Sequence, residues 1–337
     1  MLACLRRFYE EIGAGGFSTV YKGRLRCTVE FVGIRRVEKS QQAKISTEVQ
    51  AMHSLDHPNV LKFHAWFATS NSLWVVTEYC AGGDLRRLLL QDGSLPEDTV
   101  LSFGLDVLSA LHYVHSHGIL TVDLRPSAVL VNESGIAKLG DFGHARRIEQ
   151  PIWADDAPTQ HRLALMQQVS PSFVAPELHL RTSGYSIASD FWGLASLLHE
   201  MATGWPPYTV GRRPEEVAFA VSNSPLAAIE TSSHTLNELL QWLHAKDPIA
   251  RPNWSSLGSH KFWRVIVGPP ALALTSESDG NGGHLSDGNG GHLSDGNGGH
   301  LGDGNSVHQP VEEDGAALNA SGGSERRLSA STLRSSS

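Results

Sequence analysis

The hydrophobic pattern of the chain changes its period near residue 80. Before that point, short runs of alternating apolar residues such as "TVEFVGIRRV" and "LWVVTEY" predict strands around one helical stretch, Glu48 to Met52. After Gly82 the apolar residues recur at helical spacing, as in "SDFWGLASLLHEMATG". We therefore expect an α+β protein with two lobes, a small strand-rich lobe over about residues 8–80 and a large helical lobe over about 81–263.

The last part of the chain, residues 264–337, differs in composition from the rest. It contains no Phe, Trp or Tyr, holds 15 of the 33 glycines, and carries the octapeptide "SDGNGGHL" three times, starting at Ser278, Ser286 and Ser294. Such a stretch buries too little apolar surface to offset the entropy of folding, so we predict a disordered, low-complexity tail. The repeat lacks the ligand order of a calcium-binding loop, which favours a flexible linker.

The charge balance and the cysteine content narrow the classes of function. With 27 Lys and Arg against 35 Asp and Glu, the formal charge of -8 argues against a general affinity for nucleic acid or for an anionic membrane. Cys4, Cys27 and Cys80 are few and widely spaced, so neither a disulfide framework nor a Cys-rich zinc site is predicted. The sequence shows no signal peptide and no run of about 18 apolar residues, and we expect a cytoplasmic location.

The stretch "IGAGGFSTVYKG" (residues 12–23) is glycine-rich and lies near the start of the strand-rich part. Glycines let a backbone turn approach phosphate groups without a side chain intervening. The pattern matches Gly-x-Gly-x-x-Gly-x-Val at Gly13, Gly15 and Val20, with Ser18 in place of the third glycine. A dinucleotide-binding fingerprint would need a helix directly afterwards, and a P-loop would end in Gly-Lys-Ser/Thr, so this stretch favours neither.

Further short motifs follow the glycine loop in a fixed order. They are "FVGIRRV", "VVTEYCAGGDL", "LTVDLRPSAVLV", "DFG", "APE", "SDFWGLASLLHEM" and "KDPIARP". With the loop, they make residues 8–263 resemble the eukaryotic protein-kinase superfamily. The stretch "LKFHAWFATSNSLWVVTEYCAGGDLRRLL" is similar to the Fused and RUNKEL branch, which includes pseudokinases of the unc-fifty-one-like kinase four type.

This resemblance implies a role for each matching residue. Asp123 would orient and deprotonate the substrate hydroxyl with Arg125 beside it, and Asp141 would bind Mg²⁺. Ser170, seven residues before Glu177, would direct any activity toward Ser or Thr. The implied cofactors are ATP and Mg²⁺, the latter weakly held. The predicted ATP-binding residues are Ile12, Gly13, Ala14, Gly15, Gly16, Val20, Arg35, Glu48, Glu78, Cys80 and Leu130.

Several residues around these acids depart from the kinase pattern. The strand lysine is replaced by Arg35, whose planar fork Glu48 could hold bidentately. The His-Arg-Asp triplet has become Thr121-Val122-Asp123, and the metal-binding asparagine is Ala128, which has no side-chain oxygen. Because one preorganised contact contributes about 10²- to 10³-fold to turnover, we expect phosphoryl transfer at roughly 10⁻³ per second or less.

Other polar residues receive structural interpretations. By resemblance, Glu177 and Arg251 are predicted to form a buried ion pair, and Asp190 to anchor the backbone of the catalytic loop from below. The histidines of "LHYVHSHG" (residues 111–118) follow a helical stretch and are predicted to cap it or to face solvent.

The sequence leaves three functions open. The first is an ATP-binding, RUNKEL-like regulatory protein with weak or absent Ser/Thr phosphoryl transfer. The second is an active atypical kinase in which Arg35 and a single Mg²⁺ at Asp141 suffice, and the third is a nucleotide-free scaffold. The retained "DFG", Glu48 and glycine loop favour ATP binding. The resemblance also implies protein partners and an association with microtubules.

Overall fold

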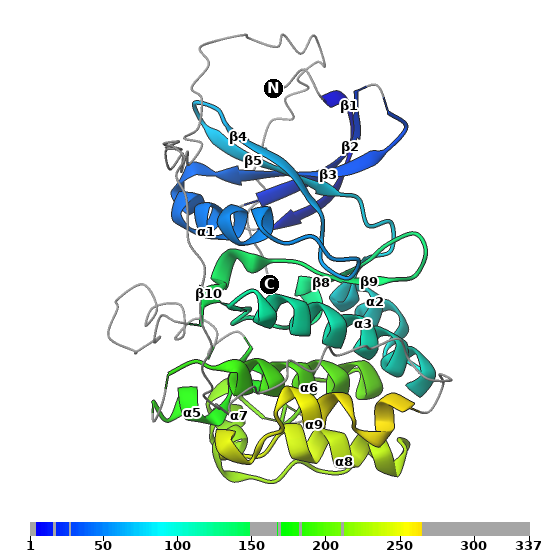
Figure 1. The fold of residues 1–337 in the computed structure, drawn as a ribbon, viewed down its shortest axis with the longest axis vertical. Helices are drawn as coiled ribbons and strands as arrows, with labels where there is room; N and C mark the ends of the chain where they lie inside the picture. The colour runs from blue at the N-terminus through cyan, green and yellow to red at the C-terminus, as the bar shows by residue number, and fades with distance from the viewer. Residues whose placement is uncertain are drawn as a thin grey trace, which may run out of the picture.

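The computed structural model describes residues 5–15, 18–26, 28–148, 167, 170–181, 184–209 and 212–264. These residues form two lobes. The upper lobe in Figure 1 is a β-sheet with one helix, and the lower lobe is a group of helices. The prediction of an α+β fold with a strand-rich and a helical lobe is thus confirmed. Gly16 and the tail with its octapeptide repeats lie outside the described residues.

The upper lobe is built on an antiparallel sheet with the strand order β1-β2-β3-β5-β4. The strands are β1 (Leu5–Gly15), β2 (Ser18–Leu25), β3 (Phe31–Glu38), β4 (Phe63–Ala68) and β5 (Ser72–Glu78). Helix α1 (Gln42–His53) covers one face, where Ile45 and Val49 pack with Val37, Leu73 and Val75. A second apolar cluster of the sheet, separate from this one, contains Val32, Ile34 and Val76.

The lower lobe is mainly helical. Its helices are α2 (Leu85–Asp92), α3 (Glu97–Ser116), α5 (Pro176–His179), α6 (Ile187–Thr203), α7 (Pro214–Asn223), α8 (His234–Leu243) and α9 (Trp254–Gly258). Its short strands are β6 (Gly83–Asp84), β7 (Ile119–Leu120), β8 (Val129–Val131), β9 (Ala137–Leu139) and β10 (Arg146–Arg147). The β7–β8 connection includes the one-turn helix η3 (Pro126–Ala128), and η4 (Phe142–His144) follows β9. In Figure 1, β8, β9 and β10 lie at the end of the lower lobe that faces the upper lobe.

Helix α6 forms the centre of the lower lobe. Most of its residues are buried, including Phe191 and Trp192, in agreement with its mainly apolar sequence. Gly104 lets α3 approach it closely, because an added Cβ there would lie 2.9 Å from Leu198 and 3.1 Å from Trp263. The interior position of these tryptophans matches their apolar sequence context.

The predicted ion pair between Glu177 and Arg251 is confirmed. Both guanidinium Nη atoms donate to the carboxylate, at 2.8 Å to Oε1 and 2.7 Å to Oε2, and both side chains are buried. This bidentate geometry ties α5 to the segment that precedes α9. The described residues contain no helix with the length and apolar character that a membrane crossing requires.

Glu200 carries an uncompensated carboxyl group within the lower lobe. It lies on α6, its side chain is buried, and Oε2 accepts no hydrogen bond among the described residues. Burial raises the pKa of Glu200 from 4.5 to about 7, although the charge of Arg86 opposes the shift. The folded protein therefore retains a proton that the unfolded chain releases at lower pH.

We expect ionisation of Glu200 to contribute a fall in the free energy of unfolding as the pH rises from 4.5 to about 7. A shift of this size corresponds to a loss of up to about 3 kcal/mol. Glu200→Gln should lack this contribution, so that its free energy of unfolding rises relative to that of the wild type over this pH range, measured by urea unfolding at a series of pH values. Glu215→Gln, at an exposed position of α7, should keep the wild-type slope. An unchanged slope in Glu200→Gln would exclude this carboxyl group as its source.

Candidate functional site

The candidate site lies where the two lobes meet and takes its residues from four segments. Strand β3 supplies Arg35, α1 supplies Glu48, the β7–β8 connection supplies Asp123, and the turn after β9 supplies Asp141. Arg35 contacts Glu48, and Arg125 contacts both acids, 3.1 Å from Asp123 Oδ1 and 3.9 Å from Asp141 Oδ2. The structure thus brings these sequence-predicted residues into one cluster.

The catalytic loop is anchored by Asp190 at the start of α6, as predicted. Its two carboxylate oxygens accept five hydrogen bonds, from the Thr121 and Val122 amides, the Thr121 and Tyr185 hydroxyls and the ring of His115, at 2.7–3.0 Å. Burial opposes the charge, but the hydrogen bonds from His115 and Thr121 lower the pKa of Asp190 below its usual range. The loop is therefore fixed from beneath by a buried, ionised carboxylate.

Val122 adopts a strained backbone conformation within this loop. Its φ is +68°, in the left-handed region that β-branched residues avoid. Such a conformation costs about 1–3 kcal/mol and persists only where the surroundings impose it. Here the hydrogen bond from the Val122 amide to Asp190, at 3.0 Å, holds it. The loop keeps its bent shape although the arginine of the kinase pattern is missing.

Asp123 is buried and lies next to two basic side chains. It is 5% exposed, and its Oδ1 lies 3.1 Å from Nε of Arg125. Its Oδ2 lies 3.8 Å from Nε2 of His144, a residue that the sequence interpretation did not include. The carboxylate that would receive a substrate proton is therefore already paired with basic groups.

Asp141 is placed between two cations. Its Oδ1 lies 3.7 Å from Nζ of Lys44 on α1, and its Oδ2 lies 3.9 Å from Nη2 of Arg125. Burial alone would raise the pKa of Asp141, but Lys44, Arg35 and further cations outweigh it and lower that pKa below its usual range. The carboxylate is accordingly ionised at neutral pH.

The predicted pair of Arg35 and Glu48 is present, but it is not bidentate. Arg35 Nη2 donates to Glu48 Oε1, while Glu48 Oε2 is buried and accepts no hydrogen bond among the described residues. Burial opposes the charge of Arg35, yet the Glu48 carboxylate raises the pKa of this guanidinium above its ordinary value. The expectation of a two-point contact was wrong because only one nitrogen of the fork reaches the carboxylate from β3.

The predicted phosphate-side residues lie on the β1–β2 hairpin. Ile12, Gly13, Ala14 and Gly15 end β1, and Gly13 faces Val20 of β2 across the ladder. The hairpin is the one that the glycine pattern predicted, with strands on both sides. Its role in nucleotide binding stays a prediction.

The predicted adenine-side residues lie at the end of β5 and on β8. Glu78 is held by two contacts, accepting from the Lys62 amide at 2.6 Å and lying 3.0 Å from Nζ of Lys138. Leu130 is half-buried on β8. Burial raises the pKa of the Cys80 thiol to about 12, so this cysteine is not a reactive thiolate at neutral pH.

Ser170 lies directly before the one-turn helix η5 (Pro171–Phe173). Its carbonyl oxygen accepts a hydrogen bond from the Phe173 amide at 3.1 Å. This contact shapes the turn, and the proposed action of Ser170 on Asp123 stays a prediction.

Three residues at or near the site were missed or misread from the sequence. His115 was predicted to cap its helix or face solvent, but it is 5% exposed and binds Asp190. The apolar residues Leu108 and Leu111 precede it at helical spacing, and this signal could have placed His115 on the buried face of α3. Lys44 and His144 carry no comparable signal, because only the folded chain brings them near the two acids.

The donor set does not fit a divalent cation well. Mg²⁺ prefers oxygen ligands, and Asp141 would supply a buried oxygen that accepts no hydrogen bond. Ala128, at the position of the family's second ligand, is 1% exposed and offers no oxygen from its side chain. Lys44 and Arg125 lie within 4 Å of the one remaining carboxylate and repel a metal ion there. No cluster of three metal-ligating side chains occurs in the described ranges.

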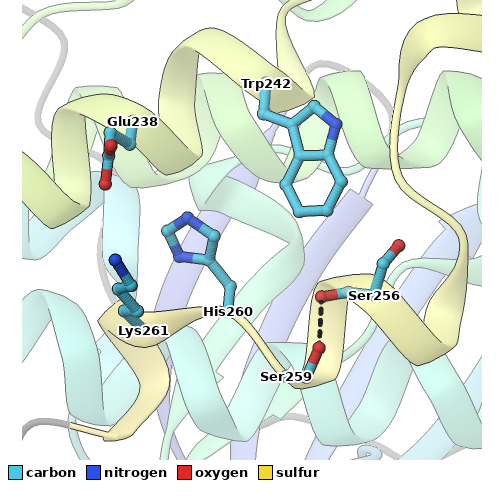
Figure 2. Close-up of a pocket in the computed structure, with 6 residues that line it drawn as sticks. All are labelled: Glu238, Trp242, Ser256, Ser259, His260 and Lys261. Carbon is cyan, nitrogen blue, oxygen red and sulfur yellow. Dashed lines mark hydrogen bonds between the residues drawn. The ribbon is translucent and has the colours of Figure 1, made fainter.

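A separate hollow lies at the base of the lower lobe. Figure 2 shows its lining, with Trp242 and Glu238 of α8 facing His260 and Lys261. The Ser259 hydroxyl donates to the Ser256 carbonyl at 3.0 Å, and the rings of Trp242 and His260 lie 5.9 Å apart. None of the predicted site residues lines this hollow.

The two-lobed fold and the loops that carry Asp123 and Asp141 are those of a protein kinase domain. The protein kinase domain family matches residues 6–263, and the chain belongs to this family. The serine/threonine-protein kinase RUNKEL of Arabidopsis thaliana is 41% identical over 260 residues, which cover 77% of this chain and 18% of that protein. The serine/threonine-protein kinase ULK4 of Mus musculus is 35% identical over 277 residues, covering 76% and 21%.

The serine/threonine-protein kinase 36 of Mus musculus is 33% identical over 258 residues, covering 75% of this chain and 19% of that protein. RUNKEL and ULK4 support the predicted placement of the chain in the RUNKEL/ULK4-like kinase branch. The chain spans about a fifth of the length of these curated relatives.

Proposed function

We propose that this chain is an ATP-binding regulatory protein with the kinase fold and with weak or absent Ser/Thr phosphoryl transfer. The observation that carries this proposal is that both acids of the site face basic side chains of the chain itself, Arg125 for both and Lys44 for Asp141. The basic groups attract the phosphates of a nucleotide. The same groups restrain the carboxylates that catalysis would use.

The retained parts of the site support nucleotide binding. Glu48 on α1 accepts a hydrogen bond from Arg35, so β3 carries the permanently charged guanidinium group in a fixed position. Strand β1 ends in the glycines of the predicted phosphate-binding stretch, and Asp190 keeps the catalytic loop bent. A chain used only as a nucleotide-free scaffold would need none of these features.

The altered parts of the site support slow chemistry. Asp123 would accept the proton of a substrate hydroxyl, but its Oδ1 already lies 3.1 Å from Nε of Arg125, a cation that competes with the hydroxyl for this oxygen. Ala128 gives no side-chain oxygen to a metal. Losses of about 10²- to 10³-fold per preorganised contact would bring the rate to roughly 10⁻³ per second or less.

For partners we propose proteins, with Ser or Thr as the acceptor if transfer occurs. Microtubule-associated assemblies are the class that the resemblance to this branch suggests. We propose a cytoplasmic location, in agreement with the sequence expectations, and no binding of nucleic acid or membrane.

The proposal is tested with the full chain by titration calorimetry with ATP and by a phosphoryl-transfer assay on Ser/Thr peptides. We expect ATP to bind, and transfer to stay near or below about 10⁻³ per second, with any residual rate removed in Asp123→Asn. No binding of ATP in any buffer would favour the nucleotide-free scaffold. Transfer at about 1–100 per second would instead identify an ordinary active kinase.

A further inference from the structure

Lys44 is positioned on α1 to reach the phosphate end of the candidate site. It lies four residues before Glu48, and residues at this spacing share one face of a helix. The stem of its side chain runs along Gly143, where an added Cβ would lie 2.8 Å from Cγ of Lys44 and collide with the stem. The glycine after Phe142 therefore leaves the space through which Lys44 extends.

The ammonium group of Lys44 lies next to the carboxylate of Asp141, the residue that was predicted to bind Mg²⁺. Its Nζ lies 3.7 Å from Asp141 Oδ1, a buried atom that accepts no hydrogen bond among the described residues. The other oxygen of this carboxylate, Oδ2, lies 3.9 Å from Nη2 of Arg125. The positive charges next to Asp141 are thus side chains of the protein.

The other basic residues nearby differ from Lys44 in their partners or in their shape. Arg35 is bound to Glu48, and Arg125 spans the two acids at 3.1 and 3.9 Å. Lys22 of β2 lies over aromatic rings, 4.5 Å from the ring centre of Phe31 and 4.7 Å from that of Tyr79. Among these side chains, Lys44 is the one that lies near Asp141 and carries a compact ammonium group with three hydrogen-bond donors.

We propose that Lys44 takes the place of the divalent cation, its ammonium bridging Asp141 and the phosphates of the nucleotide. The inference rests on the proposed ATP binding and adds how the phosphates are held. An ammonium group is an effective point-charge binder of phosphate, and with Ala128 in place of the second ligand a metal ion would have to displace it. The chain accordingly binds ATP without Mg²⁺, and Mg²⁺ adds little to the affinity.

The test is titration calorimetry of the full chain with ATP, once in EDTA and once in excess Mg²⁺. For the wild type we expect affinities that agree within about threefold, whereas Lys44→Met should lose about 10- to 100-fold in EDTA, the range for a hydrogen-bonded charge contact. Lys39→Met, at an exposed position shortly before α1, should behave as the wild type. Unchanged affinity of Lys44→Met in EDTA, or a wild type that binds only with Mg²⁺, would overturn the inference.

Adenosine separates the loss of a phosphate contact from a general disturbance of the site. Adenosine carries no phosphate, so Lys44→Met should bind it as tightly as the wild type does, while an equal loss for adenosine and ATP would contradict the proposal. Lys44→Gln, which keeps a polar end without the charge, should show the same selective loss if Lys44→Met does not fold. No ATP binding by the wild type in either buffer would instead overturn the proposed function itself.

Discussion

Replacing Asp190 by alanine is expected to lower the free energy of unfolding by more than about 4 kcal/mol, a loss that few single substitutions reach. The carboxylate accepts five hydrogen bonds at 2.7–3.0 Å and is fully buried. Its removal leaves these donors without an acceptor, and each unsatisfied buried donor costs about 1–3 kcal/mol. The left-handed backbone of Val122, with φ at +68°, also loses the contact that holds it.

Urea unfolding of the full chain measures this effect. The matched control is Asp92→Ala, at an exposed position of α2, which should stay within about 0.5 kcal/mol of the wild type. If Asp190→Ala does not fold, Tyr185→Phe removes one of the five donors and should cost about 1 kcal/mol. A loss below about 2 kcal/mol for Asp190→Ala would show that the donors find other acceptors, and that this carboxylate is not the anchor of the loop.

The fold could be predicted because its signals are local. The alternation of apolar residues along β3 and β5, and the helical period of α6, are set by which faces are buried. The pair of Glu177 and Arg251 could also be predicted, because both residues stand in motifs whose order matches the family. These features need no knowledge of distances between remote segments.

The arrangement of charges in the site could not be predicted in the same way. Lys44 shares a helix face with Glu48, but the sequence does not show that it comes within 3.7 Å of Asp141 when α1 packs against the turn after β9. His144 lies 3.8 Å from Asp123 although 21 positions separate them in the sequence. The sequence shows which residue types are missing, such as the oxygen at Ala128, but not which side chains occupy the space that remains.

The site should regain phosphoryl transfer when two of its replaced residues are restored. In Arg35→Lys/Ala128→Asn, the strand again carries an ammonium and the loop again carries an amide oxygen that can bind a metal ion. Each restored contact is worth about 10²- to 10³-fold, although contacts that act together are not additive. We therefore expect the rate of transfer to a Ser/Thr peptide, measured with excess Mg²⁺, to rise by at least about 10²-fold.

Two further variants decide how this gain arises. Adding Asp123→Asn should return the double variant to background, because the restored contacts still need a carboxylate to accept the proton of the hydroxyl. Adding Lys44→Met should raise the rate again, because the ammonium 3.7 Å from Asp141 Oδ1 competes with the metal that the restored asparagine would help to hold. A double variant that stays at the wild-type rate, with or without Lys44, would show that the pairing of Asp123 with Arg125 at 3.1 Å limits the chemistry. The slow step would then lie in proton acceptance rather than in the binding of the metal.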